Sequence, residues 1–381
     1  MSLFQATTIM GLLATGMGVA LLGSVKLPLA RKLQINETRV GGMVSMFGFA
    51  MIPTMLAVGF VTDLVGKQPV VIGGSLFMTA SLILLAQSRT YWPALLGVLL
   101  LSVGWAMLIN VINPLALFAF PGAETYAMNM ACFFFGLGAF LTPLVAAFLL
   151  RRMELPRVLL VLAGFVVATA VLAVGVDFST LTATGGPQAV AAPPKAGIGT
   201  LVGDSIMWLC ALLLFFYAPL EATMAAWATT YLGNKGVSEG AASGLLSGYW
   251  LTYVASRLVA AYALPSGSEA AVILALAVLC VGIWAVVVFS RGRAVAGAMV
   301  VAAGFIFGPI FPTLMAVLFG HFDEALHGRA VGLLFAVGGL GWTAIPMLIG
   351  AYAQRKGVQR GFLMAAASAV GLAAIAFILA V

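Results

Sequence analysis

Charged residues are scarce in this chain of 381 residues, where Asp, Glu, Lys and Arg together make up 8% of the sequence. A soluble domain usually carries about a quarter charged residues, so this chain has too few to cover a surface exposed to water. Hydrophobic residues make up 63%, and several apolar runs exceed the roughly 18 residues that mark a transmembrane helix. The composition therefore fits an integral membrane protein, with the lipid bilayer as a partner and no nucleic acid expected.

Other absences narrow the class further. The apolar runs lack the alternation of β-barrel strands, so we expect helices, which satisfy their own backbone hydrogen bonds in lipid. The three cysteines, Cys132, Cys210 and Cys280, each lie inside an apolar run without CxxC or Cys/His spacing. We therefore expect neither a disulfide framework nor a metal site. The amino terminus has no basic region and no small-residue cleavage site, so it is predicted to remain as the first span.

The connections between the runs also lack the motifs of an enzyme. No glycine-rich phosphate-binding loop occurs there, so nothing indicates direct drive by ATP. No Ser/His/Asp set or pair of carboxylates converges from these connections. The stretch "HFDEALHGR" (321–329) holds both histidines beside two acids, but we interpret it as a solvated loop. We expect no enzyme, no metal and no cofactor.

Charged residues and Gly/Pro-rich breaks divide the chain into twelve predicted helices. Their ranges are 5–30, 40–61, 67–87, 91–120, 123–150, 156–176, 203–231, 239–262, 269–290, 295–320, 328–351 and 361–380. The connection 177–200 is polar, rich in Pro and Gly, and lies at the midpoint of the chain, which indicates a flexible linker. The predicted fold is all-α and spans the membrane, with one six-helix bundle at 1–176 and a second at 201–381.

The two bundles are predicted to be pseudo-symmetric copies. The fifth predicted helix carries "GAFLTP" (138–143) and the eleventh carries "GWTAIP" (341–346), each with Gly and Pro five residues apart. Both stretches fall on the fifth helix of their own half. Internal repeats of this kind are a known transporter architecture.

The corner after the second predicted helix reads "GFVTDLVGK" (59–67). This stretch resembles the signature of the major facilitator superfamily, in which Gly is followed by Asp four residues on, Gly three further, and then a basic residue. Gly59, Asp63, Gly66 and Lys67 match that pattern, and Gln68 stands where a second basic residue is usual. The resemblance implies a secondary transporter that works by alternating access. Twelve helices in one chain form a complete pathway, so a monomer suffices.

Physical chemistry suggests a gating role for this corner. Asp63 lies at a helix end, where it can accept hydrogen bonds from the N-terminus of another helix. We expect a latch that closes one face of the bundle in one state, with Arg257 near the end of the eighth predicted helix as the partner of Asp63. The alternative is a solvated charge in a turn.

A narrower resemblance points to the fucose–galactose–glucose/proton symporters within that superfamily. The segments that carry it are "KLPLARKL" (26–33), "NPLALF" (113–118), "FFYAPLEA" (215–222), "YWLTYVASR" (249–257) and "FIFGPIFPTLM" (305–315). The family carries an Asp where this chain has Ser24 and a Glu where it has Ile109. Cys132 and Phe135 replace polar Gln and Asn. The N-terminal half therefore lacks the acids that would take the proton in that family.

Glu221 is the strongest candidate for a functional charge within a span. It lies midway along the seventh predicted helix, two residues after Pro219, which bends the helix and frees a backbone carbonyl. A carboxyl group there must be protonated, paired or facing water. We interpret Glu221 as a group that binds substrate or takes a coupling proton, and the alternative is a neutral Glu bonded to the freed backbone.

Other polar or aromatic side chains in the spans are substrate-binding candidates. The amides could bind a ligand or join helices to one another. The aromatic rings offer apolar faces that stack on sugars, or they could pack and anchor the spans. Lys26 could face a cavity or reach the membrane surface. These candidates are Asn110, Asn113, Asn129, Tyr217, Trp227, Trp250 and Lys26.

The loop charges conflict with the family in orientation. Thirteen basic residues fall in the odd-numbered connections: Arg31, Lys32, Arg39, Arg89, Arg151, Arg152, Arg157, Lys235, Arg291, Arg293, Arg355, Lys356 and Arg360. Lys67, Lys195 and Arg329 fall in the even-numbered ones. The positive-inside rule would place both termini outside, whereas the resemblance implies cytoplasmic termini in the cell inner membrane, which we adopt.

Together these features predict a transporter for a small polar solute, a sugar or a sugar acid, with Glu221 as the candidate for proton coupling. An efflux transporter for amphipathic compounds is the alternative. It is favoured by Ile109, Cys132 and Phe135 at positions that are polar in the symporters.

Overall fold

The computed structural model describes residues 2–35, 37–176, 178 and 198–381. Most of the chain in these ranges is helical, and they contain no β-strand. The prediction of an all-α membrane fold is thereby confirmed. Of the predicted linker 177–200, residues 177 and 179–197 lie outside the described residues.

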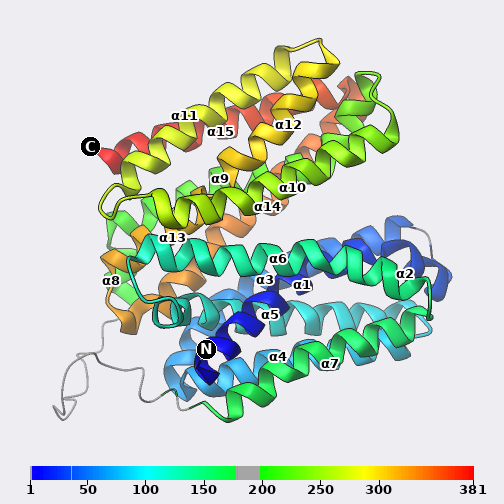
Figure 1. Cartoon of the computed structure of the whole chain (residues 1–381), viewed down its shortest axis with the longest axis vertical. Helices are drawn as coiled ribbons and strands as arrows, with labels where there is room; N and C mark the ends of the chain where they lie inside the picture. Colours follow the sequence, from blue (N-terminus) through cyan, green and yellow to red (C-terminus); the bar gives the residue numbers. More distant parts are fainter. Residues whose placement is uncertain (1, 36, 177, 179–197) are drawn as a thin grey trace. The chain divides into compact units, whose positions relative to one another are not determined.

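The helices of the first half are α1 Leu3–Ser24, α2 Lys26–Leu33, α3 Glu37–Val65, α4 Lys67–Gln87, α5 Tyr91–Ala119, α6 Glu124–Leu150 and α7 Leu155–Val174 (Figure 1). Those of the second half are α8 Ile198–Val202, α9 Ser205–Asn234, α10 Glu239–Ala263, α11 Glu269–Phe289, α12 Arg293–Phe307, α13 Ile310–His321, the 3₁₀ turn η2 Glu324–Leu326, α14 His327–Lys356 and α15 Val358–Ala380.

Two predicted helices are each divided in two. The range 5–30 forms α1 and α2, which meet at Val25. The range 295–320 forms α12 and α13, separated at Gly308 and Pro309. Proline has no backbone N–H, so Pro309 cannot make the helical bond to the carbonyl of Phe305, which explains the second break.

Among the described residues, eleven candidate spans are long and apolar enough to cross a membrane. α12, Gly308, Pro309 and α13 together make one of these spans, Arg293–His321. The 25-residue helix α10 is outside this set because its sequence is more polar, with serines, glycines and Arg257 along its length. The polar residues of α10 include Arg257, which belongs to the candidate site.

The chain divides into two compact units. Unit 1 contains residues 1–121, 134–203 and 324–333, and unit 2 contains residues 122–133, 204–323 and 334–381. Both α6 and α14 therefore contribute residues to each unit.

The helices of each unit pack in a repeated pattern. In unit 1, α4 packs on α5 and α7, and α1 packs on α7. In unit 2, α11 packs on α12 and α15, and α9 packs on α15. The helices at the same place in the two halves therefore choose corresponding neighbours.

The two copies of the Gly–Pro motif serve the same packing role. A Cβ atom on Gly138 of α6 would lie 2.8 Å from the Cα of Leu13 in α1. A Cβ atom on Gly341 of α14 would lie 3.1 Å from the Cα of Phe215 in α9. Each glycine thus lets the fifth long helix of its half approach the backbone of the first, which only a missing side chain permits.

Candidate functional site

The corner at 59–67 is built by the end of α3 and the start of α4. α3 ends at Val65, and Gly66 precedes α4 with a φ of 86°, a conformation that glycine adopts at little cost. This turn places Asp63 and Lys67 at one end of unit 1, beside residues 324–333 of the same unit.

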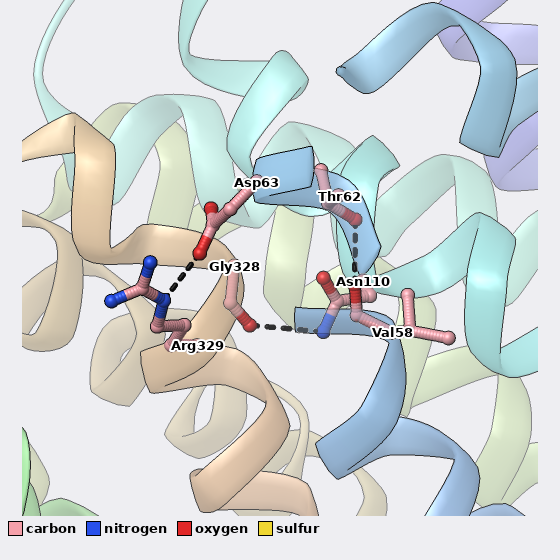
Figure 2. A network of polar contacts seen from close by, with 6 residues as sticks. All are labelled: Val58, Thr62, Asp63, Asn110, Gly328 and Arg329. Carbon is pink, nitrogen blue, oxygen red and sulfur yellow. Dashed lines mark hydrogen bonds and ion pairs between the residues drawn. The ribbon is translucent and has the colours of Figure 1, made fainter. Parts of the chain in front are cut away.

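Two ion pairs join this corner to the start of α14. Asp63 accepts a hydrogen bond from Arg329, and Lys67 donates to Glu324 of η2. Figure 2 shows the first pair beside a third contact, in which Asn110 Nδ2 of α5 donates to the Gly328 carbonyl at 3.1 Å. Exposed ion pairs contribute only about 0–1 kcal/mol each, and these side chains are 23–34% exposed. The contact is therefore specific but weak enough to break and re-form.

Gly59 brings the two helices together at this contact. A Cβ atom there would lie 2.9 Å from the Gly328 carbonyl oxygen and 3.0 Å from the Cα of Arg329. These are backbone atoms, which cannot rotate away. Only glycine therefore fits at position 59 while α14 lies this close.

The predicted pairing of Asp63 with Arg257 was wrong. Arg257 lies within α10 and is only 2% exposed. Its N–H groups bond inside unit 2, whereas Asp63 bonds Arg329 in unit 1. The sequence signal for Arg329 is its place at the start of a predicted helix, next to the acids Asp323 and Glu324.

Glu221 lies in a hydrogen-bond network of unit 2. Its Oε2 atom is 2.9 Å from the Tyr217 hydroxyl, one turn earlier on α9, and 2.7 Å from the Tyr253 hydroxyl on α10. Arg257 Nη2 donates to that Tyr253 hydroxyl at 2.6 Å. Tyr217 and Tyr253 are almost wholly buried, so a carboxyl group that sequence reasoning placed in an apolar span has polar partners.

The same network bonds the backbone where α12 ends. The Tyr217 hydroxyl donates to the Phe307 carbonyl at 2.9 Å, and Arg257 Nε donates to the Gly308 carbonyl at 3.1 Å. A helical carbonyl normally accepts from the N–H four residues later, and Pro312 has none to offer Gly308. The break in this span thus leaves an acceptor that a side chain from α10 satisfies.

Arg257 makes a further hydrogen bond to α6. Its Nη1 donates to the Cys132 carbonyl at 2.7 Å, and its guanidinium lies 4.2 Å from the centroid of the Tyr253 ring. A buried arginine is costly unless hydrogen-bonded. Here it holds α6, α10 and the α12 break together.

The hydrogen atoms of this network have a chemical consequence. The Tyr217 hydroxyl carries one hydrogen and lies 2.9 Å from both Glu221 Oε2 and the Phe307 carbonyl oxygen. An ionised Glu221 only accepts, so one of these two acceptors must then lack the hydrogen. A protonated Glu221 can donate to Tyr217, which then donates to Phe307. A proton on Glu221 therefore allows the Tyr217 hydroxyl to bond both Glu221 and the Phe307 carbonyl.

The other proposed binding residues are dispersed. Trp250 packs edge-on against Tyr249 and Tyr253, with ring centroids 5.0 and 5.5 Å away, so it borders the Glu221 network. Trp227 lies against α14 at Gly350. The side chain of Lys26 lies outside the described residues.

The three asparagines are buried and lie apart from the bonds that Glu221 makes. Asn110 joins two helices of unit 1, and Asn129 Nδ2 donates to the Thr125 carbonyl of its own helix at 2.8 Å. Within the described ranges, Asn110 Oδ1, Asn113 Nδ2 and Asn129 Oδ1 have no hydrogen-bond partner. All three amides retain capacity for a ligand. Tyr253 was missed, although it lies one turn before Arg257 on the same face of α10.

The histidine stretch is more helical than expected. His321 ends α13, residues 324–326 form η2, and α14 begins at His327. His321 Nε2 lies 3.0 Å from Asp204 Oδ2, and Asp204 also caps α9 by accepting from the Met207 N–H at 3.1 Å. Burial opposes ionisation of Asp204, but the His321 and Met207 bonds outweigh it and lower the pKa of this carboxyl. No group of three potential metal ligands occurs among the residues that the structure covers.

Comparison with known proteins identifies the family to which this chain belongs. The profile of the Major Facilitator Superfamily matches residues 8–346. The structure is similar to that of the E. coli fucose:proton symporter FucP, with a TM-score of 0.79 and 15% identity, over 100% of this chain and 99% of that one. It is also similar to the human organic anion transporter MFSD10, with a TM-score of 0.74 and 18% identity, over 99% of each chain.

A curated relative matches only in part. Bypass of stop codon protein 6 of Saccharomyces cerevisiae (strain ATCC 204508 / S288c) is 28% identical over 174 residues. The match covers 43% of this chain and 35% of the yeast protein.

Proposed function

Because the chain belongs to the Major Facilitator Superfamily, we propose that it moves a small polar solute, a sugar or a sugar acid, by alternating access in symport with protons. The observation that carries the proton coupling is the single hydrogen of Tyr217, which lies between Glu221 and the Phe307 carbonyl. A proton-coupled transporter needs a group whose protonation changes the contacts between its helices.

Glu221 meets that requirement in unit 2. When it loses its proton, the Tyr217 hydrogen turns toward the carboxylate, and the Phe307 carbonyl loses a donor. When it gains a proton, the Tyr217 hydrogen returns to Phe307, at the end of α12. Protonation of one carboxyl thereby alters a bond between α9 and the break in the tenth span. If the end of α12 moves during the transport cycle, the bond from Tyr217 links that movement to the protonation of Glu221, and proton transport is thereby coupled to substrate transport.

A polar cargo fits the chemistry around Glu221. Tyr253 and Trp250 pair a hydroxyl with an indole, a combination that can bond sugar hydroxyls and stack on the C–H face of a sugar ring. Arg257 adds a cation within the same network, which favours a carboxylate on the cargo. The description of FucP as a fucose:proton symporter supports the same cargo class.

We propose the family orientation, with both termini in the cytoplasm and the protein monomeric in the inner membrane. The corner of Asp63 and the termini then share one side. Labelling of single cysteines placed at Leu64 and at Arg152 with an impermeant maleimide, applied to intact cells, tests this. Labelling at position 152 and protection at position 64 supports the family orientation. The reverse result supports the orientation that the loop charges predict, with both termini outside.

A second candidate is efflux of amphipathic compounds. Ile109 and Cys132 are buried and apolar, at positions where the resembling symporters are polar. The similarity to a transporter described as carrying organic anions is consistent with such a cargo.

Uptake into proteoliposomes separates these proposals. Labelled neutral and acidic monosaccharides are offered with and without an inward proton gradient. Accelerated uptake of one sugar supports symport, and uptake that follows only the concentration gradient indicates a uniporter. Absence of sugar uptake, with competition between hydrophobic compounds for export, moves the assignment to efflux.

A further inference from the structure

A groove lies at the end of unit 1 opposite the Asp63 corner. α2 and the turn from α6 to α7 line a volume of about 870 Å³. Four cations contribute to its walls, namely Arg31, Lys32, Arg152 and Arg157, against the single acid Glu154. Clustered like charges repel one another unless an anion lies among them.

The arginines of this groove are available to a ligand. Arg31, Arg152 and Arg157 are exposed, and within the described part of the chain none of them forms an ion pair. Lys32 is held in place by donating to the Leu85 and Ala86 carbonyls at 2.7 and 2.6 Å. Those carbonyls lie at the C-terminal end of α4, where a cation is favoured. The groove therefore carries more positive than negative charge, and its three arginines have no ion-pair partner among the described residues.

An apolar stripe continues from the groove along α6. The Arg152 guanidinium lies 4.4 Å from the centroid of the Phe148 ring. Leu141, Leu144 and Phe148 share one face of α6 and are 41%, 54% and 53% exposed. α6 is long and apolar enough to span the membrane. A cationic groove at the end of such a stripe matches a molecule with an anionic head and an apolar tail.

We propose that this groove binds the phosphate of an anionic phospholipid, with an acyl chain along Leu141, Leu144 and Phe148. The planar guanidinium groups of Arg31, Arg152 and Arg157 suit the oxygens of a phosphate, which they can bond in pairs. The continuous apolar stripe distinguishes a lipid from a soluble anion. This site is separate from the transport chemistry of unit 2 and does not depend on it.

Native mass spectrometry of the purified full chain tests the proposal. The protein is titrated with phosphatidylglycerol and with phosphatidylcholine of the same acyl chains. We expect preferential binding of phosphatidylglycerol, weakened about fivefold by Arg152→Gln and about 25-fold by Arg152→Gln with Arg157→Gln, at roughly 1 kcal/mol for each basic residue. Arg152→Lys with Arg157→Lys, which keeps the charges, retains most of the preference.

The matched control removes two exposed arginines elsewhere. Arg291→Gln with Arg293→Gln changes the net charge equally but lies at the turn from α11 to the first residue of α12, so it leaves the preference unchanged. An equal loss in this control overturns the proposal, because a diffuse charge effect would then explain it. Competition by glycerol phosphate as strong as that by the lipid also overturns it, since the occupant would then be a soluble anion.

Discussion

The contact between α3 and the start of α14 depends on the missing side chain at Gly59. Gly59→Ala would place a methyl group 2.9 Å from the Gly328 carbonyl oxygen, and 3.0 and 3.2 Å from the Cα and N atoms of Arg329. All three atoms belong to the backbone of α14, so the helices must separate to relieve the contact. Overpacking of this kind costs about 1–3 kcal/mol.

That cost is large compared with the bonds that hold the contact. The Asp63–Arg329 and Lys67–Glu324 pairs are partly exposed, and pairs of this kind contribute about 0–1 kcal/mol each. A change of 1–3 kcal/mol shifts an equilibrium by about 5- to 150-fold. We therefore expect Gly59→Ala to populate a state in which α3 and α14 are apart at this point.

Electron–electron distance measurements between spin labels report this change directly. Labels at Leu64→Cys and Ala325→Cys occupy exposed positions on either side of the contact. In the Gly59→Ala background the distance distribution should shift to longer values. Gly164→Ala on α7 is the control, because no atom lies within 4 Å of its new methyl group. A Gly59→Ala protein that is folded and gives the parent's distribution would refute the reasoning.

Three further changes test other parts of the account. Asp63→Asn removes the charge that Arg329 bonds, so turnover should fall while the apparent affinity for substrate stays constant; altered affinity with normal turnover would contradict the latch. Tyr217→Phe deletes the hydroxyl between Glu221 and Phe307, so substrate exchange should continue while acceleration by a proton gradient declines; full acceleration in this variant would exclude Tyr217 from coupling. The lowered pKa of Asp204 means that its bonds stabilise the fold above the unfolded pKa and that this stability is lost as the pH falls. Asp204→Ala should therefore lower the free energy of unfolding by about 1 kcal/mol at neutral pH and by less in acid, whereas an equal loss in thermal denaturation at both pH values would show that the carboxylate charge does not matter.

Local features of the sequence predicted most of the helices. The lengths of the apolar runs and the glycines and prolines between them act over a few residues, so α4, α5 and α11 begin and end within one residue of their expected limits. The paired stretches at 138–143 and 341–346 carried information about packing as well, because both glycines meet the backbone of another helix.

Long-range pairing was beyond the reach of this reasoning. Asp63 and Arg329 are 266 residues apart, and no local pattern distinguishes Arg329 from Arg257 as a partner. Glu221 was singled out because a carboxyl group in an apolar span requires an explanation. Its partners Tyr217 and Tyr253 depend on how α9 and α10 face each other, which periodicity alone does not determine.

Replacement of Glu221 by glutamine tests the central claim most directly. In Glu221→Gln, the amide can donate to the Tyr217 hydroxyl as a protonated Glu221 would, although its nitrogen cannot accept from Tyr253. The variant should therefore keep the Tyr217–Phe307 bond and still exchange labelled for unlabelled substrate. An inward gradient supplies about 1.4 kcal/mol per proton for each pH unit, so the unaltered protein should accumulate substrate up to about tenfold per unit in proteoliposomes. The account predicts that Glu221→Gln exchanges substrate without accumulating it. Accumulation by the variant equal to that of the unaltered protein would contradict the account.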